Sequence, residues 1–205
     1  AKELLADIFN GTDFSKIYNP DTLKRVFFSK RLSIGDLAKV FDYLSASSLE
    51  VGGKPVQGAK LVGERKNGEQ AFGIMAQLHG NEPCGLAAVL LTLALNEANL
   101  LKKPVITYIG NLRAATQYFT AWRQNPDARY EDRDIYRIGT GDAGDPPEDM
   151  NRIIETFLEG ETSNPYILRV REIYYLAKEH LSGLLDIHSA RGKLTCVTNI
   201  GENDK

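Results

Sequence analysis

The first fifty residues carry hydrophobic positions at helical spacing. Between Ile34 and Leu44, apolar side chains recur every three or four positions, which places them on one face of an α-helix. Ser33 precedes this segment, and Asp21 precedes the segment TLKRVFFSK. Both residue types commonly cap helix N-termini. The pattern therefore predicts helices that begin after Asp21 and after Ser33.

The hydrophobic pattern changes after the Gly and Pro residues at 52–55, where strands begin to alternate with helices. Asn67-Gly68 is typical of a hairpin turn, and the polar stretch 125–149 predicts a long loop. This alternation favours an α/β fold with helices on the faces of a sheet. The expected helices cover residues 83–98, 113–122 and 165–180, and the expected strands are VQGAKLVGER, AFGIMAQLHG, PVITYIGN, LSGLLDIHS and KLTCVTNIG.

Composition narrows the class of protein. The 205 residues are 42% hydrophobic and 25% charged, which suits one folded domain. We expect residues 1–50 to form a helical N-terminal extension and residues 51–205 an α/β domain. The net charge of −2 argues against a nucleic-acid partner. No apolar run is long enough to span a bilayer, so no membrane partner is expected. Two cysteines form no disulfide framework, which favours a cytoplasmic location.

Two of the three histidines end predicted strands. His79 ends AFGIMAQLH and His188 ends LLDIH. Ligands of open α/β sheets bind beyond the carboxyl ends of the strands, so both histidines are expected at a site. His180 ends the predicted helix 165–180 instead, where a cation is favourable, and we assign it no function.

Glu82 follows His79 by three positions, across a glycine that permits a tight turn. Histidine and carboxylate are ligands that zinc uses at catalytic sites, and a third ligand would complete the set. His188 is the natural third ligand. The alternative is that His79 caps a helix and Glu82 is an acid in its first turn. On spacing alone, the two interpretations are equally good.

Asp186 and His188 are two positions apart in a predicted strand, so they share one face. A carboxylate beside a ligand histidine fixes its tautomer, which would give Asp186 a supporting role. The alternative is an acid–histidine pair that merely closes the strand. Without other information, this alternative is the better interpretation.

The string Asp149-Met150-Asn151-Arg152 follows the polar loop. The rigid fork of Arg152 suits a carboxylate, and Asn151 adds donors and an acceptor. The alternative is a helix start with Asp149 as its cap and Arg152 on the surface. Taken alone, this second interpretation is the better one.

Taken together, four strings in order resemble a known family. They are HGNEPCG at 79–85, GN at 110–111, DMNR at 149–152 and DIHSA at 186–190. The chain resembles the succinylglutamate desuccinylase/aspartoacylase family, a branch of the zinc carboxypeptidase-like hydrolases. The resemblance begins near residue 56, and no motif covers the first fifty residues.

The resemblance implies a zinc-dependent hydrolase that splits an amide bond in a small N-acyl amino acid. Zinc would be held by His79, Glu82 and His188. Asn151 and Arg152 would bind the substrate carboxylate, and Asp149 would orient His79. The implied fold is a mixed, mostly parallel sheet flanked by helices, as in the zinc carboxypeptidases.

The chain departs from the family pattern in two places. The family has an arginine ahead of its DxNR string, and here Arg123, Arg129, Arg133 and Arg137 all compete for that role. RYEDRDIYR at 129–137 imitates the string but has Tyr136 where Asn is expected.

The family's general base is a glutamate well after the second zinc histidine. Only 17 residues follow His188, and we do not assign their single glutamate, Glu202. The base is therefore expected beyond Lys205, in a C-terminal part that the chain lacks. Two alternatives remain open, a zinc carboxypeptidase acting on peptides and a truncated or inactive domain that keeps the metal site.

Overall fold

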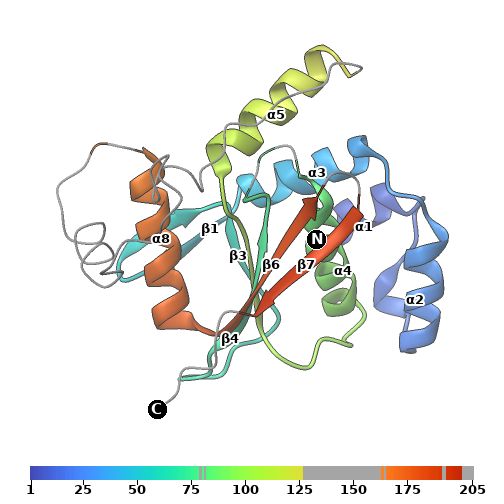
Figure 1. The fold of residues 1–205 in the computed structure, drawn as a ribbon. Helices are drawn as coiled ribbons and strands as arrows, with labels where there is room; N and C mark the ends of the chain where they lie inside the picture. Colours follow the sequence, from blue (N-terminus) through green and yellow to red (C-terminus); the bar gives the residue numbers. More distant parts are fainter. Residues whose placement is uncertain (79, 81, 127–162, 164, 191–192, 200–205) are drawn as a thin grey trace.

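The computed structural model of the chain describes residues 1–78, 80, 82–126, 163, 165–190 and 193–199. At positions 165–167, 188–190 and 193–199 only the backbone is described. In chain order the elements are α1 (Lys2–Ile8), the 3₁₀ helix η1 (Phe14–Lys16), α2 (Pro20–Ser29), α3 (Ile34–Ser45), β1 (Ser48–Val51), β2 (Lys54–Gln57), β3 (Ala59–Val62), β4 (Ala71–Ala76), α4 (Cys84–Glu97), β5 (Val105–Ile109), α5 (Leu112–Gln124), α8 (Pro165–His180), β6 (Leu181–Ala190) and β7 (Lys193–Asn199) (Figure 1).

The centre of the molecule is a five-stranded sheet in the order β3-β5-β4-β6-β7. β4 pairs in parallel with β5 and β6, whereas the outer strands β3 and β7 run antiparallel to their neighbours. The prediction of a mixed sheet flanked by helices is confirmed. Its mostly parallel character holds only for the three central strands, because two of the four described pairings are antiparallel.

The region before β4 differs from the prediction. A turn does form at Asn67-Gly68, where the Glu69 amide donates to the Lys66 carbonyl at 3.0 Å. It does not join a hairpin, because β3 pairs with β5 and leaves both edges of β4 to β5 and β6. The single strand expected over VQGAKLVGER is two strands, since Gly58 breaks it at a φ of 70°. The first of these, β2, pairs with β1 in a separate two-stranded sheet.

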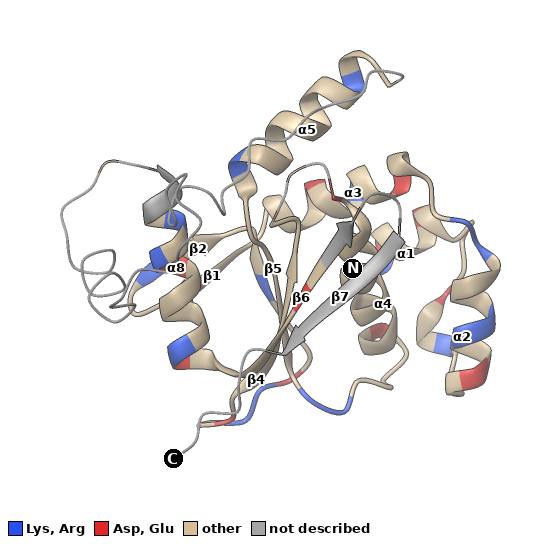
Figure 2. Cartoon of the chain, viewed as in Figure 1, with Lys and Arg blue, Asp and Glu red and all other residues tan. Residues whose placement is uncertain are grey.

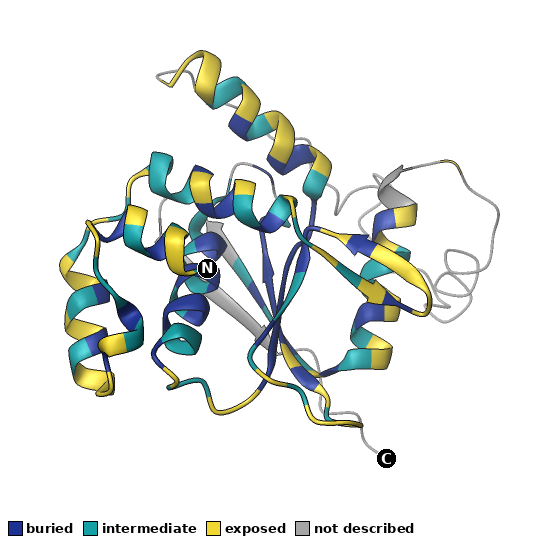
Figure 3. Ribbon diagram, turned by 180° about the vertical axis from the view of Figure 1, so that it is seen from behind, coloured by how far each residue is buried: buried dark blue, intermediate teal, exposed yellow. Residues whose placement is uncertain are grey.

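Helices cover both faces of the sheet. α1 to α4 lie on one face, and α8 with the β1–β2 hairpin lies on the other (Figure 1). Two hydrophobic clusters fill these layers, one under α4 and one under α8. Figure 3 shows the buried residues concentrated in the sheet and on the helix sides that face it. Among the described helices, none combines the length and the apolar character needed to cross a lipid bilayer.

The start of α3 is as predicted, and that of α2 is not. Ser33 Oγ accepts from the Asp36 amide at 3.1 Å, and the Asp36 carboxylate accepts from the Ser33 amide at 2.9 Å, which is a capping box. α2 is capped by Asn19, whose side chain accepts from the Asp21 amide at 2.8 Å, and not by Asp21. The reason is Pro20, whose fixed φ suits the first helical position. The helix therefore begins closer to the N-terminus than expected.

The N-terminal helices share a core with the α/β region. Leu5 and Ile8 of α1 and Phe41 of α3 belong to the same hydrophobic cluster as Leu90 of α4. Phe41 also stacks on Phe119 of α5 at a centroid distance of 4.7 Å. The helical content expected for residues 1–50 is confirmed, and their division from residues 51–205 stays a prediction.

Candidate functional site

The carboxyl ends of β4 and β6 lie next to each other. Ala76, the last residue of β4, pairs with Ile187, and Met75 pairs with Asp186. Position 188 of β6 is therefore one residue beyond the end of β4, where the chain turns toward α4. We call this side of the sheet the carboxyl edge. The β4–α4 turn and the second half of β6 meet there.

The β4–α4 turn begins with a buried polar residue. Gln77 follows β4 with a φ of 54°, and its side chain is fully buried. Its Nε2 donates to the Gly80 carbonyl at 3.0 Å. The Gln77 side-chain amide thus takes the place of a backbone hydrogen bond across the turn and satisfies the buried Gly80 carbonyl.

Gly80 is required by space. A Cβ at this position would lie 2.4 Å from the carbonyl carbon of Ala114 in α5. No side chain of any size fits against that backbone. The glycine of the HGNE string therefore lets the β4–α4 turn lie directly on the first turn of α5.

The β5–α5 turn is hydrogen-bonded to the end of β4 and the start of the β4–α4 turn. The Gly110 amide donates to the Ala76 carbonyl at 2.8 Å, and the Asn111 amide donates to the Gln77 carbonyl at 3.0 Å. The Asn111 side chain caps α5 by accepting from the Ala114 amide at 2.9 Å. The GN string thus joins the two turns.

The start of α4 also lies at the carboxyl edge. Gly85, in its first turn, would carry a Cβ only 2.8 Å from Cα of Ala76 and 3.4 Å from the carbonyl oxygen of Ile187. Glu82 and Cys84 are both half-buried just before and at the start of this helix. The structure therefore brings Glu82 to the side of the sheet where β4 and β6 end.

Of the sequence-predicted ligands, Glu82 alone has a described side chain. His188 lies in β6 with only its backbone described, and His79 lies outside the described residues, as do Asp149, Asn151 and Arg152. Within the described part of the chain, no three His, Cys, Asp or Glu side chains gather in a way that would hold a metal ion.

Of the four arginines that compete for the position ahead of the DxNR string, one is described. Arg123 donates to the Asp42 carboxylate at 2.7 Å from the far end of α5. Eleven helical residues from the β5–α5 turn correspond to about 16 Å, so Arg123 lies away from the carboxyl edge. Arg129, Arg133 and Arg137 lie outside the described residues.

Beneath the carboxyl edge lies a polar group that the sequence patterns did not single out as a unit. Tyr108, Met75 and Asp186 pair across three strands and so share one face. Tyr108 is fully buried, and Asp186 is 4% exposed. Figure 2 shows that charged residues are few in the central strands compared with the helices and loops. A buried aspartate in β6 therefore stands out.

Arg169 of α8 completes this group. Burial raises the pKa of the Tyr108 hydroxyl far above its ordinary value, the Asp186 carboxylate raises it further, and the Arg169 charge opposes both. Tyr108 is therefore neutral at physiological pH. Arg169 is 8% exposed, and no sequence signal indicated its burial, because arginine on an amphipathic helix normally faces water.

The third histidine lies at the other side of the sheet, which we call the amino edge. Nη1 of Arg65 lies 2.9 Å from Nδ1 of His180. Because arginine only donates, Nδ1 must accept, and Nε2 carries the proton. Burial lowers the pKa of His180, and Arg65 lowers it further against the opposing Glu179 carboxylate. Both effects favour the neutral imidazole, and the Arg65 guanidinium supplies positive charge beside this helix end.

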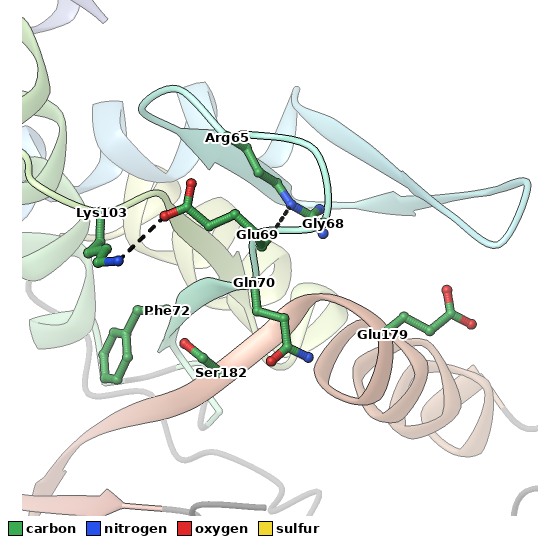
Figure 4. A pocket seen from close by; sticks show the side chains of 8 residues that line it. All are labelled: Arg65, Gly68, Glu69, Gln70, Phe72, Lys103, Glu179 and Ser182. Carbon is green, nitrogen blue, oxygen red and sulfur yellow. Dashed lines mark hydrogen bonds and ion pairs between the residues drawn. The ribbon is translucent and has the colours of Figure 1, made fainter.

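The amino edge also contains a hollow of about 800 Å³ (Figure 4). Two described contacts join residues of its lining. Arg65 Nε donates to the Glu69 carbonyl, and Lys103 lies 3.6 Å from the Glu69 carboxylate. None of the sequence-predicted site residues lines it. The lining residues are Arg65, Gly68, Glu69, Gln70, Phe72, Lys103, Glu179 and Ser182.

Comparisons with family models, curated proteins and solved structures return no match to this chain.

Proposed function

We propose that the chain is a zinc-dependent hydrolase that cleaves an amide bond in a small N-acyl amino acid. One observation carries the proposal. The pairing of Ala76 with Ile187 brings the turn after β4 beside position 188 of β6, so segments more than 100 positions apart converge at one edge. These are the segments that contain the HGNE and DIHSA strings.

The residues near this edge suit a zinc ion. Glu82 supplies a half-buried carboxylate at the start of α4, and His79 and His188 supply imidazoles, which together form a donor set that zinc prefers. When bound, zinc supplies Lewis acidity that polarises a carbonyl and favours the ionisation of water near neutral pH. The buried Asp186, two positions before His188, offers a carboxylate to support that ligand.

The chain's other residues would bind and orient the substrate. We assign Asn151 and Arg152 to the substrate carboxylate, because a bidentate fork matches its two oxygens, and Asp149 to the orientation of His79. We assign the proton-transferring role to no residue of this chain. The proposal includes a zinc carboxypeptidase-like fold and a cytoplasmic location, the latter supported by the low cysteine count.

The three histidines provide a direct test. We expect the full chain to bind one zinc ion, and His79→Ala and His188→Ala each to lose it while the far-ultraviolet circular dichroism is kept. His180→Gln is the matched control and should retain zinc, because His180 contacts Arg65 at the amino edge. Zinc content after gel filtration, measured by atomic emission, reads out all four proteins. Stoichiometric zinc in His79→Ala would refute the ligand assignment.

A substrate panel tests the reaction. The zinc-loaded chain is assayed against N-acyl amino acids and against short peptides. Turnover of N-acyl amino acids alone supports the proposal, and turnover of peptides alone indicates a carboxypeptidase. Zinc binding by this chain without turnover of either class favours the alternative of a truncated or inactive domain that keeps the metal site.

A further inference from the structure

We propose that Arg169 is a positioning residue for the zinc site, which it serves by fixing the β4–α4 turn through the last carbonyls of β5. The proposal rests on the function proposed above, because it concerns the same site. A series of contacts leads from α8 through the end of β5 to the turn before Glu82.

All three nitrogens of the Arg169 guanidinium are engaged. Nη2 donates to the Ile109 carbonyl, Nε donates to the Gly110 carbonyl at 3.3 Å, and Nη1 donates to the Glu172 carboxylate at 2.7 Å. A charged side chain that is 8% exposed is costly unless such bonds compensate its desolvation. The planar fork makes all three bonds together, and a lysine ammonium in its place does not.

The residues that Arg169 holds are bonded in turn to the end of β4. While the carbonyls of Ile109 and Gly110 face Arg169, the Gly110 amide donates to the Ala76 carbonyl at 2.8 Å. The Asn111 amide, one residue on, donates to the Gln77 carbonyl at 3.0 Å. The end of β5 is therefore fixed on one side by α8 and fixes the start of the β4–α4 turn on the other.

Two described contacts hold the turn itself. Gln77 Nε2 holds the Gly80 carbonyl, and Gly80 lies against the backbone of Ala114. Within the described part of the chain, no donor reaches Oε1 of Gln77 and no acceptor reaches Nδ2 of Asn111, although their side chains are 0% and 2% exposed. Neither buried amide has a second bond that would compensate for the loss of Arg169.

Two substitutions in the full chain test the role. Arg169→Lys keeps the charge, Arg169→Met removes it, and Lys178→Met is the control, because Lys178 is exposed on the same helix. Zinc affinity is measured by competition with a chromophoric chelator. We expect about tenfold weaker zinc binding in Arg169→Lys, the lower end of what supporting residues of metal sites contribute. Arg169→Met should bind more weakly still, and Lys178→Met should equal the wild type.

A second readout does not need zinc. The amides of Gly110 and Asn111, followed by hydrogen exchange in the metal-free chain, should exchange faster in Arg169→Lys than in Lys178→Met. Unchanged exchange and unchanged zinc affinity in a folded Arg169→Lys would overturn the proposal and leave the zinc function standing. If the wild-type chain binds no zinc, the zinc function and the role of Arg169 in it are both overturned. Faster exchange in Arg169→Lys would then show only that Arg169 holds the end of β5.

Should Arg169→Met not fold, Glu172→Gln provides a milder variant. It neutralises the carboxylate that accepts from Nη1 and leaves both carbonyl bonds in place. We expect about threefold weaker zinc binding. A loss of stability in urea with wild-type zinc affinity, in this variant and in Arg169→Lys, would show a purely structural role and would refute the proposal.

Discussion

The two edges of the sheet use glycine for different reasons. At the carboxyl edge, Gly80 and Gly85 each face backbone atoms that leave no room for a Cβ. At the amino edge, Gly68 has open space around it but a φ of 78°, which L-residues rarely adopt. One edge therefore needs glycine for close packing of backbone, and the other needs it for the direction of a turn.

The histidines differ in a parallel way. His180 at the amino edge has its tautomer fixed by Arg65, and the neighbouring charged side chains contact one another. At the carboxyl edge, the ends of β4 and β6 and the start of α4 pack closely together. His180 thus has a described structural contact, whereas the zinc-binding role of His79 and His188 is the proposal that the histidine variants test.

The largest expected effect separates the two kinds of glycine. Gly80→Ala should lower the free energy of unfolding by about 3 kcal/mol, because its Cβ would overlap Ala114 and force backbone to move. Gly68→Ala should cost only about 1 kcal/mol, the penalty of a left-handed backbone. Urea denaturation measures both. Gly80→Ala should also weaken zinc binding, and equal losses in the two variants would remove the distinction between the edges.

A pH series tests the neutral state of His180. In the folded chain its pKa lies below the ordinary 6.5, so above pH 6.5 it is neutral in both states and its contribution to stability is complete. As the pH falls below 6.5, the unfolded chain takes up the proton first, and the free energy of unfolding declines. His180→Gln should lose less stability than the wild type between pH 7.5 and 5.5. Parallel curves for the two proteins would contradict the lowered pKa.

The smallest expected effect gives a baseline for a loss of stability alone. Ser33→Ala removes the cap of α3, including the 3.1 Å bond from the Asp36 amide, and should cost about 1 kcal/mol. Zinc binding should not change, because the cap bonds join Ser33 only to Asp36 in the first turn of α3. If zinc affinity fell in Ser33→Ala as it does in Gly80→Ala, the loss in the glycine variant would reflect global stability.

The sequence was sufficient for elements with strong local signals. The cap at Ser33 and the apolar run of β4 each depend on neighbours within a few positions. Both elements form, although β4 ends at Ala76 and so does not extend to His79 as expected. The placement of β3 beside β5 was not predictable, because strand order is set by which edge of β4 is occupied after the helices pack. Asn67-Gly68 gives a turn and cannot specify which strands pair.

The candidate site divides in the same way. The strings around Glu82 and His188 were recognisable from scarce residue types at strand ends, and the structure brings their segments to one edge. Arg169 was not recognisable, because its burial results from contacts with residues about 60 positions away. A local hydrophobic pattern cannot distinguish an arginine that faces water from one that caps the end of a strand.

The position of β4 at the centre of the sheet bears on how the chain is made. Ser182 at the start of β6 donates to the Ala71 carbonyl across 111 positions. The hydrogen-bonding edge of β4 that pairs with β6 therefore has no partner strand until most of the chain has been synthesised. At roughly 5–20 residues per second, this apolar strand stays uncovered for several seconds after it leaves the ribosome. The helices α1 to α4 precede β5 and β6 in the chain, and their early packing would cover one face of β4 during that interval.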